Sequence, residues 1–308
     1  MSASVAERIR VRTSALGLLA DTPVVTLLSG GADSTLLAVS LAELGCAARL
    51  VHVAHSLRGA ESEADEQACR RLAQQLALPL QVIDGRVPDG GNLEARLRDV
   101  RRAAALDAAD GQPIATGHTL SDRAETVLYR LAASGTPRGL AALPARDGQW
   151  VRPLIDCSRD EVRRELAGRG IAWRDDPTNL VAGPARNRIR LDVLPALALA
   201  HPGAERNLAR AAAIADDERA LLDALADDLI RHDGAVPLAT LAAAPVALQR
   251  IALRRAAARV GVTLGHDDVE ALRTAARRRT LPGAAMAEIR RGAITFLPPG
   301  SGRREEIA

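Results

Sequence analysis

The chain has 308 residues, 26% of them charged, and a formal net charge of +3 at pH 7, which is typical of a soluble globular protein of about two domains. No apolar run reaches the roughly 18 residues of a membrane helix, and the charges near the N-terminus exclude a signal peptide, so we expect a cytoplasmic protein. The 3 cysteines are too widely spaced for a disulfide framework or a CxxC site.

The chain contains no lysine, so its 41 Lys and Arg residues are all arginine. A mechanism that needs a lysine side chain of the protein itself is therefore excluded. The basic residues are also unevenly distributed, because residues 250–304 hold 12 arginines against 4 acidic residues. This segment is a candidate surface for binding a polyanion.

Short apolar runs alternate with longer amphipathic segments in the first part of the chain. The periodicity predicts strands at 24–28, 49–55, 80–87 and 113–118, and helices at 34–44, 61–77, 93–110 and 121–133. This βαβ alternation predicts an α/β fold with a parallel sheet that helices cover on both faces. Ligands of such sheets bind beyond the carboxyl ends of the strands, so the segments that follow the strands should converge there.

The second part of the chain differs in character. Residues 134–195 are irregular apart from a predicted helix at 158–169, and long alanine-rich and leucine-rich helices are predicted at 204–231, 244–260 and 267–279. A small hairpin should turn at Arg291-Gly292. We therefore expect a nucleotide-binding catalytic domain over 1–197 and a mainly helical domain over 198–308.

One turn between a strand and a helix carries the strongest chemical signal. Its glycines let backbone N–H groups approach an anion, its hydroxyls add donors, and the next helix adds its partial positive charge. The six residues are Ser29, Gly30, Gly31, Ala32, Asp33 and Ser34. The turn is not a Walker A loop, which needs a lysine. Asp33 would repel a polyphosphate unless a cation intervened, so it is a candidate Mg²⁺ ligand. The alternative is a tight turn in which Asp33 or Ser34 is the helix N-cap.

The hexapeptide SGGADS resembles the S-G-G-x-D-S signature of the N-type ATP pyrophosphatases, or PP-loop enzymes, whose loop holds the pyrophosphate that leaves ATP. Six later segments occur in the order and approximate spacing of the tRNA(Ile)-lysidine synthetases. They are VHVAHSLRGAESEADE, NLEARLRDVRRAAAL, ATGHTLSDRAETVLYRL, GTPRGLAALP, DDPTN and RNRIRLDVLPAL. The resemblance covers roughly residues 22–197 and implies a Rossmann-like domain of the adenine nucleotide alpha hydrolase type.

The resemblance implies a two-step reaction with ATP and Mg²⁺. Such enzymes adenylate the wobble cytidine of tRNA(Ile) with the CAU anticodon, and free L-lysine then displaces AMP to give lysidine. Asp122 and Glu125 stand at i and i+3 on one helix face and can meet one ammonium group together. The resemblance assigns them to the lysine substrate, His118 to a phosphate or the activated base, and Arg98 to the α-phosphate. Solvated helix charges and a structural histidine are the alternatives.

Further residues are candidates for the substrate or the tRNA. His55 and Arg58 follow the second predicted strand and should help to frame the adenine or tRNA pocket. Arg186, Arg188 and Arg190 suit the RNA backbone or the adenylate phosphate, with an interdomain structural role as the alternative. The C-terminal arginines, including Arg254 and Arg278, suit tRNA phosphates, unless they form only a solvated face. With 1% aromatic residues, base stacking on protein rings cannot be the main recognition device.

The sequence also departs from the family pattern. It has one histidine at His118-Thr119 and one acid at Ser121-Asp122, where the family commonly has two of each, and Arg102 stands where a tyrosine is frequent. We expect it to do without the additional C-terminal module of longer members, and the family allows a homodimer. Two other functions remain as alternatives. A tRNA thiolase would need paired cysteines, and a catalytically silent RNA-binding relative would not need Asp33, His118, Asp122 and Glu125 together.

Overall fold

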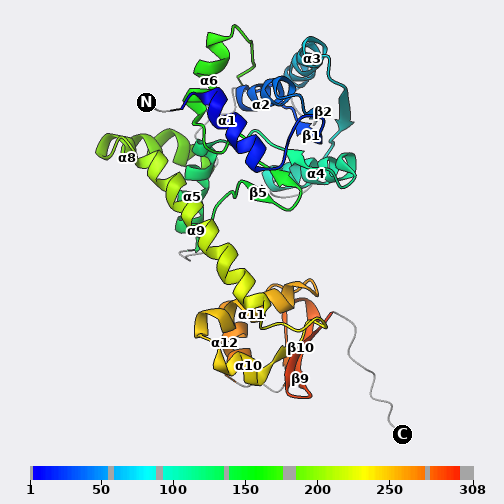
Figure 1. Ribbon diagram of the computed structural model, residues 1–308, viewed down its shortest axis with the longest axis vertical. Helices are drawn as coiled ribbons and strands as arrows, with labels where there is room; N and C mark the ends of the chain where they lie inside the picture. Colours follow the sequence, from blue (N-terminus) through cyan, green and yellow to red (C-terminus); the bar gives the residue numbers. More distant parts are fainter. Residues whose placement is uncertain are drawn as a thin grey trace. The chain divides into compact units, whose positions relative to one another are not determined.

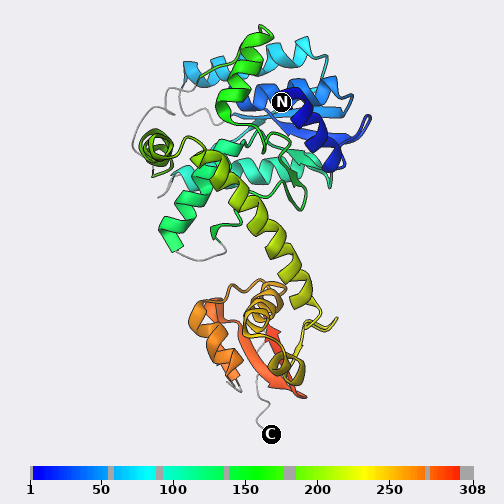
Figure 2. The same ribbon diagram turned by 60° about the vertical axis from the view of Figure 1, so that its left-hand side comes forward.

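The computed structural model of the chain describes residues 3–54, 59–87, 93–134, 139–175, 185–274 and 278–298. Contacts between Cα atoms divide the chain into two compact units, Met1–Ala215 and Asp216–Ala308 (Figure 1, Figure 2). This division falls inside helix α9 (Ala204–Asp227) rather than near residue 198. The domain boundary near 198 stays a prediction.

The first unit is built on a six-stranded sheet in the order β3-β2-β1-β4-β6-β5. Its strands are β1 (Pro23–Leu27), β2 (Ala47–Ala54), β3 (Leu80–Asp84), β4 (Ile114–Ala115), β5 (Arg146–Asp147) and β6 (Trp150–Val151). All neighbouring strands are parallel except β5, which pairs with β6 in the antiparallel sense. The predicted α/β fold is confirmed, although β4 is much shorter than the predicted strand at 113–118.

Helices cover both faces of this sheet because its central strands are apolar on both sides. The helices are α1 (Val5–Ala15), α2 (Ala32–Glu43), α3 (Ala60–Gln75), α4 (Leu93–Ala109), α5 (Leu120–Ser134), α6 (Arg159–Gly168), α7 (Ala185–Arg188), the π-helix η3 (Ile189–Val193) and α8 (Leu194–Ala200). Val24 packs with Leu36 and Leu37 of α2, whereas its neighbour Val25 packs with Ala105 and other residues of α4. In Figure 1, α1, α2 and α6 lie together, and α4 lies beyond β1 and β2.

The second unit combines helices with a sheet that sequence periodicity predicted only in part. Its helices are α10 (Leu238–Ala243), α11 (Val246–Ala258), α12 (His266–Arg273) and the 3₁₀-helix η4 (Pro282–Ala284), and its sheet has the order β7-β10-β9-β8. The strands are β7 (Val236–Pro237), β8 (Arg278–Thr280), β9 (Met286–Arg290) and β10 (Ala293–Leu297). The core joins both layers, since Leu253 and Ala256 of α11 share one apolar cluster with Ile294 and Phe296.

Two predictions for this unit have opposite outcomes. The hairpin is confirmed, because β9 and β10 pair through a turn whose residues Arg291 and Gly292 have φ values of 48° and 72°. Two consecutive positive φ values are what a two-residue type I′ hairpin turn requires. The helix predicted at 267–279 is wrong at its end, since α12 stops at Arg273 and β8 pairs with β9. Within the part of the chain that the structure describes, no helix is long and apolar enough to cross a bilayer.

Candidate active site

The site lies where the strand order of the first sheet reverses. β1 and β4 are adjacent and parallel, with Thr26 opposite Ala115, and the crossovers that leave them run to opposite sides. The loop of residues 28–31 and the loop of residues 116–119 therefore leave the same edge side by side. This is the position at which open α/β sheets bind their ligands. The predicted convergence of Ser29–Ser34 with the segment around His118 is confirmed.

The SGGADS turn folds into a compact loop held by its own serines. The Ser29 N–H donates to the Ser34 hydroxyl over 3.1 Å, the Ser34 hydroxyl donates to the Gly31 carbonyl over 3.1 Å, and Gly30 has a φ of 84°. The N-cap of α2 is Gly31, and no side chain caps this helix. The interpretation of Asp33 or Ser34 as N-cap is therefore wrong. An N-terminus without a side-chain cap presents backbone N–H groups to an anion.

Gly117 brings the second loop into direct contact with the start of α2. A Cβ atom at this position would lie 2.9 Å from the Asp33 carbonyl carbon and 2.9 Å from the Ser34 nitrogen. Both neighbours are backbone atoms, which cannot move aside as a flexible side chain can. Glycine is thus required here because only glycine allows the two loops to approach this closely.

We expect Gly117→Ala to push the two loops apart. The added methyl group should lower the free energy of unfolding by about 1–3 kcal/mol, as overpacking does, and should lower ATP turnover by about tenfold or more because the phosphate loop shifts. Urea denaturation and release of pyrophosphate measure the two effects. Gly168→Ala is the matched control, since a Cβ there meets nothing within 4 Å and its backbone is not in the left-handed region. Equal effects of the two substitutions would contradict the close-approach argument.

Asp33 lies at the start of α2, and one of its carboxylate oxygens makes no hydrogen bond to the described residues. Its Oδ1 atom is buried and has no hydrogen-bond partner among the described residues, and its Oδ2 atom lies 3.8 Å from Nε of Arg159. Burial and the nearby Asp122 carboxylate raise the pKa of Asp33 to about 7, although Arg159 opposes this shift. A buried carboxylate oxygen without a donor fits a hard cation that brings its own charge. Asp33 therefore remains the candidate Mg²⁺ ligand.

Asp122 and Glu125 come together as the sequence predicted, on one face of α5. Asp122 Oδ2 accepts hydrogen bonds of 2.8 Å from both the N–H and the hydroxyl of Thr119, so this oxygen caps the helix start. Asp122 Oδ1 points elsewhere and accepts from Arg159 over 2.8 Å. Burial would raise the pKa of Asp122, but Arg159 and His118 outweigh it and the pKa is lowered. Glu125 is almost completely buried, with 3% of its side chain exposed.

Two arginines neutralise this acid pair, and the sequence pattern pointed to only one of them. Arg190 belongs to the π-helix η3, and its Nε donates to Glu125 Oε1 over 2.8 Å, while its Nη2 donates to Oε2 over 3.0 Å. Arg159, the first residue of α6, donates to Asp122 as above and to Glu125 Oε1 over 3.0 Å. Its backbone N–H also donates to Ser121 Oγ over 3.0 Å, which ties the start of α6 to the start of α5.

His118 follows β4 and faces the same cluster. Its Nδ1 lies 2.8 Å from the hydroxyl of Thr116. Burial lowers its pKa to about 4, the Asp122 carboxylate opposes this shift, and the positive charges of Arg152, Arg186 and Arg98 add to it. The imidazole is therefore neutral at pH 7. It can hydrogen-bond a phosphate or a base, but it does not bring a positive charge to the site.

The pKa of His118 should make the protein less stable in mild acid. The folded protein protonates this imidazole only near pH 4, whereas the unfolded chain does so near pH 6.5. The unfolded state therefore gains a proton first as the pH falls, and the free energy of unfolding should drop by about 3 kcal/mol between pH 7 and pH 4 on account of this residue. His118→Gln should remove that part of the drop in urea denaturation curves. An NMR titration of His118 with a midpoint near 6.5 would contradict this expectation.

The other predicted site residues are distributed around this centre. Arg98 lies on α4 with an exposed side chain, and its positive charge helps to lower the pKa of His118. Arg186 donates to the Thr126 hydroxyl over 3.1 Å, so it lies against α5 beside the acid pair. Arg188 is exposed on α7. His55 and Arg58 lie outside the described residues. Arg102 stacks over Trp150 at 4.7 Å, which gives a structural role to a position where the family often has tyrosine.

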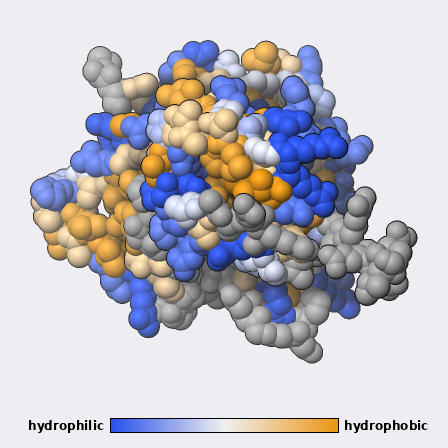
Figure 3. Space-filling view, turned by 90° about the horizontal axis from the view of Figure 1, so that it is seen from below, coloured by the Kyte–Doolittle hydropathy of each residue, from blue (hydrophilic) through white to orange (hydrophobic). Residues whose placement is uncertain are grey.

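The predicted basic surface of the second unit is largely paired with carboxylates. Arg250 and Arg273 bond Glu270, Arg255 and Arg259 bond Asp227, and Arg279 bonds Asp268. Arg254 is half-buried on α11, and the side chain of Arg278 lies outside the described residues. In the face drawn in Figure 3, hydrophilic side chains spread around the edge with hydrophobic ones between them. Because exposed ion pairs are weak, phosphates can still compete for these arginines, and tRNA binding here stays a prediction.

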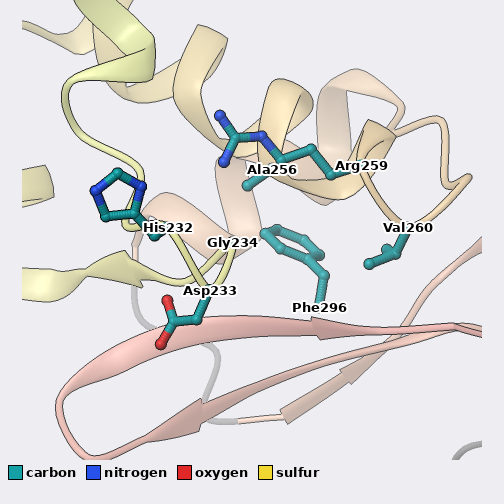
Figure 4. Close-up of a pocket in the computed structure, with 7 residues that line it drawn as sticks. All are labelled: His232, Asp233, Gly234, Ala256, Arg259, Val260 and Phe296. Carbon is teal, nitrogen blue, oxygen red and sulfur yellow. The ribbon is translucent and has the colours of Figure 1, made fainter.

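A hollow of about 220 Å³ lies in the second unit. It is lined by His232, Asp233, Gly234, Ala256, Arg259, Val260 and Phe296, which Figure 4 shows around the ring of Phe296. This volume is below the roughly 300–1,000 Å³ of ligand pockets. The hollow therefore does not compete with the loop edge of the first unit as the site of nucleotide chemistry.

Comparison with known proteins agrees with this site. Residues 7–197 match the PP-loop domain. The tRNA(Ile)-lysidine synthase of Thermus thermophilus is 39% identical over 303 residues, covering 94% of this chain but 59% of the relative. The tRNA(Ile)-lysidine synthase of Salinispora tropica is 38% identical over 308 residues, covering 91% of this chain and 92% of the relative. The chain thus spans about three fifths of the first relative and nearly all of the second.

A solved structure shares the fold at lower identity. The U34-tRNA thiolase NcsA from Methanococcus maripaludis, determined with its [4Fe-4S] cluster, superposes with a TM-score of 0.57 and 19% identity, covering 67% of this chain and 75% of that chain. This likeness shows the shared architecture. The similarity to the two synthases extends over most of this chain. The chain belongs to the tRNA(Ile)-lysidine synthase family of PP-loop proteins.

Proposed function

We propose that this protein is a ligase that joins free L-lysine to the wobble cytidine of a tRNA(Ile) with the CAU anticodon. The observation that carries the proposal is the meeting of an uncapped helix N-terminus with a buried acid pair at one sheet edge. The first feature suits the phosphates of ATP, and the second suits the amine of lysine. The names and extents of the two synthase relatives support the same reaction.

In the first step, the 2-carbonyl oxygen of cytidine attacks the α-phosphorus of ATP, and the bond to the β-phosphate breaks. The loop from Ser29 to Ser34 holds the departing pyrophosphate through backbone N–H groups and the partial charge of α2. Asp33 fits a Mg²⁺ ion through its buried Oδ1 atom, and this ion would neutralise phosphate charge when bound. Mg²⁺ is usually held by one or two carboxylates together with substrate phosphates and water, so a single carboxylate such as Asp33 would suffice from the protein.

In the second step, the lysine side-chain amine attacks C2 of the activated base, and the bond to the AMP oxygen breaks. A lysine amine is protonated at pH 7, because its unperturbed pKa is about 10.4. Asp122 and Glu125 hold the ammonium group, orient it and take up the proton that it loses on attack. Neutral His118 hydrogen-bonds the adenylate or the base, and Arg98 stabilises charge at the α-phosphate.

The cysteines argue against the thiolase alternative. Cys46, Cys69 and Cys157 are all buried. Burial raises the pKa of Cys69 to about 12 and that of Cys157 to about 11, so their reactive thiolate forms are scarce at pH 7. The acid pair argues against a catalytically silent RNA-binding relative, because binding RNA phosphates does not require buried carboxylates. The proposed reaction places the protein in the cytoplasm with tRNA, and a homodimer stays a prediction.

The test is a reconstituted reaction. The purified protein, ATP, Mg²⁺, labelled L-lysine and a tRNA(Ile) transcript with the CAU anticodon should give label in the tRNA, together with AMP and pyrophosphate in equal amounts. The release of pyrophosphate should depend on the tRNA. Absence of label in the tRNA would reject the proposal, whereas tRNA-independent ATP hydrolysis would point to a different acceptor. A transcript with guanosine at the wobble position is the matched control.

A further inference from the structure

The acid pair already holds a cation that belongs to the protein. The guanidinium of Arg159 donates to Asp122 Oδ1 over 2.8 Å and to Glu125 Oε1 over 3.0 Å. Resting on the proposed function, we propose that Arg159 occupies the lysine-amine site in the free enzyme and must be displaced by the substrate. Arg159 would then be a specificity-determining residue that sets how much free lysine is needed to enter the site.

The carboxylate oxygens show why lysine and Arg159 compete for the same place. Asp122 Oδ2 is used by Thr119, and Glu125 Oε2 accepts from Arg190. Glu125 Oε1 accepts from both Arg190 and Arg159, which fills the two lone pairs of this atom. An ammonium group that enters between Asp122 and Glu125 needs the acceptors that Arg159 uses.

The charges lead to the same conclusion. Asp122 and Glu125 supply two negative charges, Asp33 with its pKa of about 7 supplies only part of a third, and Arg159 and Arg190 supply two positive charges within the distances given above. When Asp33 is engaged by a cation with the nucleotide, the two remaining acids face two guanidinium groups and are already neutralised. A third cation between them would be repelled unless one guanidinium left. Partly buried charges make this repulsion stronger than it is in water.

Arg159 is better placed to leave than Arg190. The exposed fractions of the two side chains, 21% for Arg159 and 24% for Arg190, do not distinguish them, but Arg159 extends from the first residue of α6 and bonds each carboxylate through only one nitrogen. The backbone of Arg159 stays fixed when the side chain moves, because Ser158 caps α6 and the Arg159 N–H bonds Ser121. Arg190 holds Glu125 with two parallel hydrogen bonds, a geometry that favours a permanent partner.

The test measures binding of labelled lysine to the free protein by equilibrium dialysis, without ATP or tRNA. Arg159→Gln should bind lysine at least tenfold more tightly than the unsubstituted protein, and in the complete reaction its KM for lysine should fall while its KM for ATP stays the same. If Arg159 instead only shaped the acid pair, Arg159→Gln would bind lysine more weakly. Equal or weaker binding overturns the inference.

Two further variants keep the test decisive. Arg164→Gln is the matched control, because Arg164 is an exposed arginine of the same helix whose Nε donates to the Asp160 carbonyl, and lysine binding should not change. If Arg159→Gln does not fold, Arg159→Met decides, since methionine keeps an unbranched side chain but has neither the charge nor the donors of the guanidinium. It should also bind lysine more tightly than the unsubstituted protein. The unsubstituted protein must label tRNA in the reconstituted reaction, which separates failure of this inference from failure of the proposed function.

Discussion

Asp33→Asn is expected to lower tRNA-dependent release of pyrophosphate by about 10³-fold. The substitution keeps the size of the side chain but replaces a charged oxygen at the loop with a neutral amide. The buried Oδ1 of Asp33 has no hydrogen-bond donor among the described residues. The free energy cost of burying this charged oxygen is therefore offset only when a cation binds with the nucleotide. Electrostatic groups aimed at a reacting phosphate each contribute factors of about 10²–10³, and loss of the ion should cost at least as much. Pyrophosphate release at saturating ATP and tRNA is the measurement.

The folded protein should tolerate this change. Asp33 has a pKa of about 7, so its charge is costly in the free protein, and the neutral amide should keep or raise the free energy of unfolding at pH 8. Glu43→Gln is the matched control, because Glu43 lies at the other end of α2 and pairs with Arg169 at the surface. It should retain full activity. An active Asp33→Asn protein would contradict the assignment of Asp33 to the metal and phosphates.

Asp122→Asn is expected to separate the two chemical steps. Adenylation of tRNA should fall by a fewfold at most, whereas transfer of lysine should fall by about 10²–10³-fold, because the neutral amide no longer holds or deprotonates an ammonium group. The first turn of α5 should stay folded, since the amide oxygen of asparagine can still accept the hydrogen bond from the Thr119 N–H. The measurement compares adenylated tRNA with lysine-labelled tRNA after rapid quenching.

Asp160→Asn is the control for this experiment. Asp160 is an exposed acid in the first turn of α6, the helix that begins with Arg159, but it lies outside the cluster around the acid pair. Both steps should proceed normally in this variant. If Asp122→Asn slowed adenylation more than lysine transfer, the acid pair would instead serve the nucleotide.

Much of the site could be predicted because its parts follow local rules. The apolar runs identified the strands, and the parallel order then brought Ser29–Ser34 and His118 to one edge. The i and i+3 spacing placed Asp122 and Glu125 on one helix face. These statements depend on segments of a few residues, within which spacing and chemistry are tightly linked. The roles of the individual residues remain predictions for the experiments above.

Arg159 was not predicted because its partners are far away in the sequence. It lies 37 residues from Asp122 and 34 from Glu125. No periodicity connects these positions, and the arginine is one of many in a chain without lysine. One feature of the sequence could still have indicated such an arginine. Three acids at one sheet edge require positive charges nearby, and in a chain without lysine arginine is the residue that supplies them. The strand at Arg278–Thr280 was missed for a related reason, since β8 forms by pairing with β9 rather than by a pattern of its own.

The departures from the family pattern now have structural roles. Thr119 supplies the hydroxyl and N–H that fix Asp122, and Ser121 receives the backbone N–H of Arg159. A hydroxyl therefore supports the site at each of the two positions where the family often has a histidine or an acid. Thr119 thus holds the retained Asp122, and Ser121 holds the backbone of Arg159, the arginine that pairs with Asp122.

The caps of α5 and α6 have a consequence for the entropy of substrate binding. Thr119 with Asp122 and Ser158 with Glu161 form reciprocal caps, each made from residues three positions apart. The Ser121 contact joins the two helix starts before any substrate arrives. The backbone that carries Asp122 and Arg159 is thus already ordered in the free protein. If lysine binds between Asp122 and Glu125 as proposed, only the substrate and one arginine side chain need to be immobilised, and little conformational entropy of the backbone should be lost.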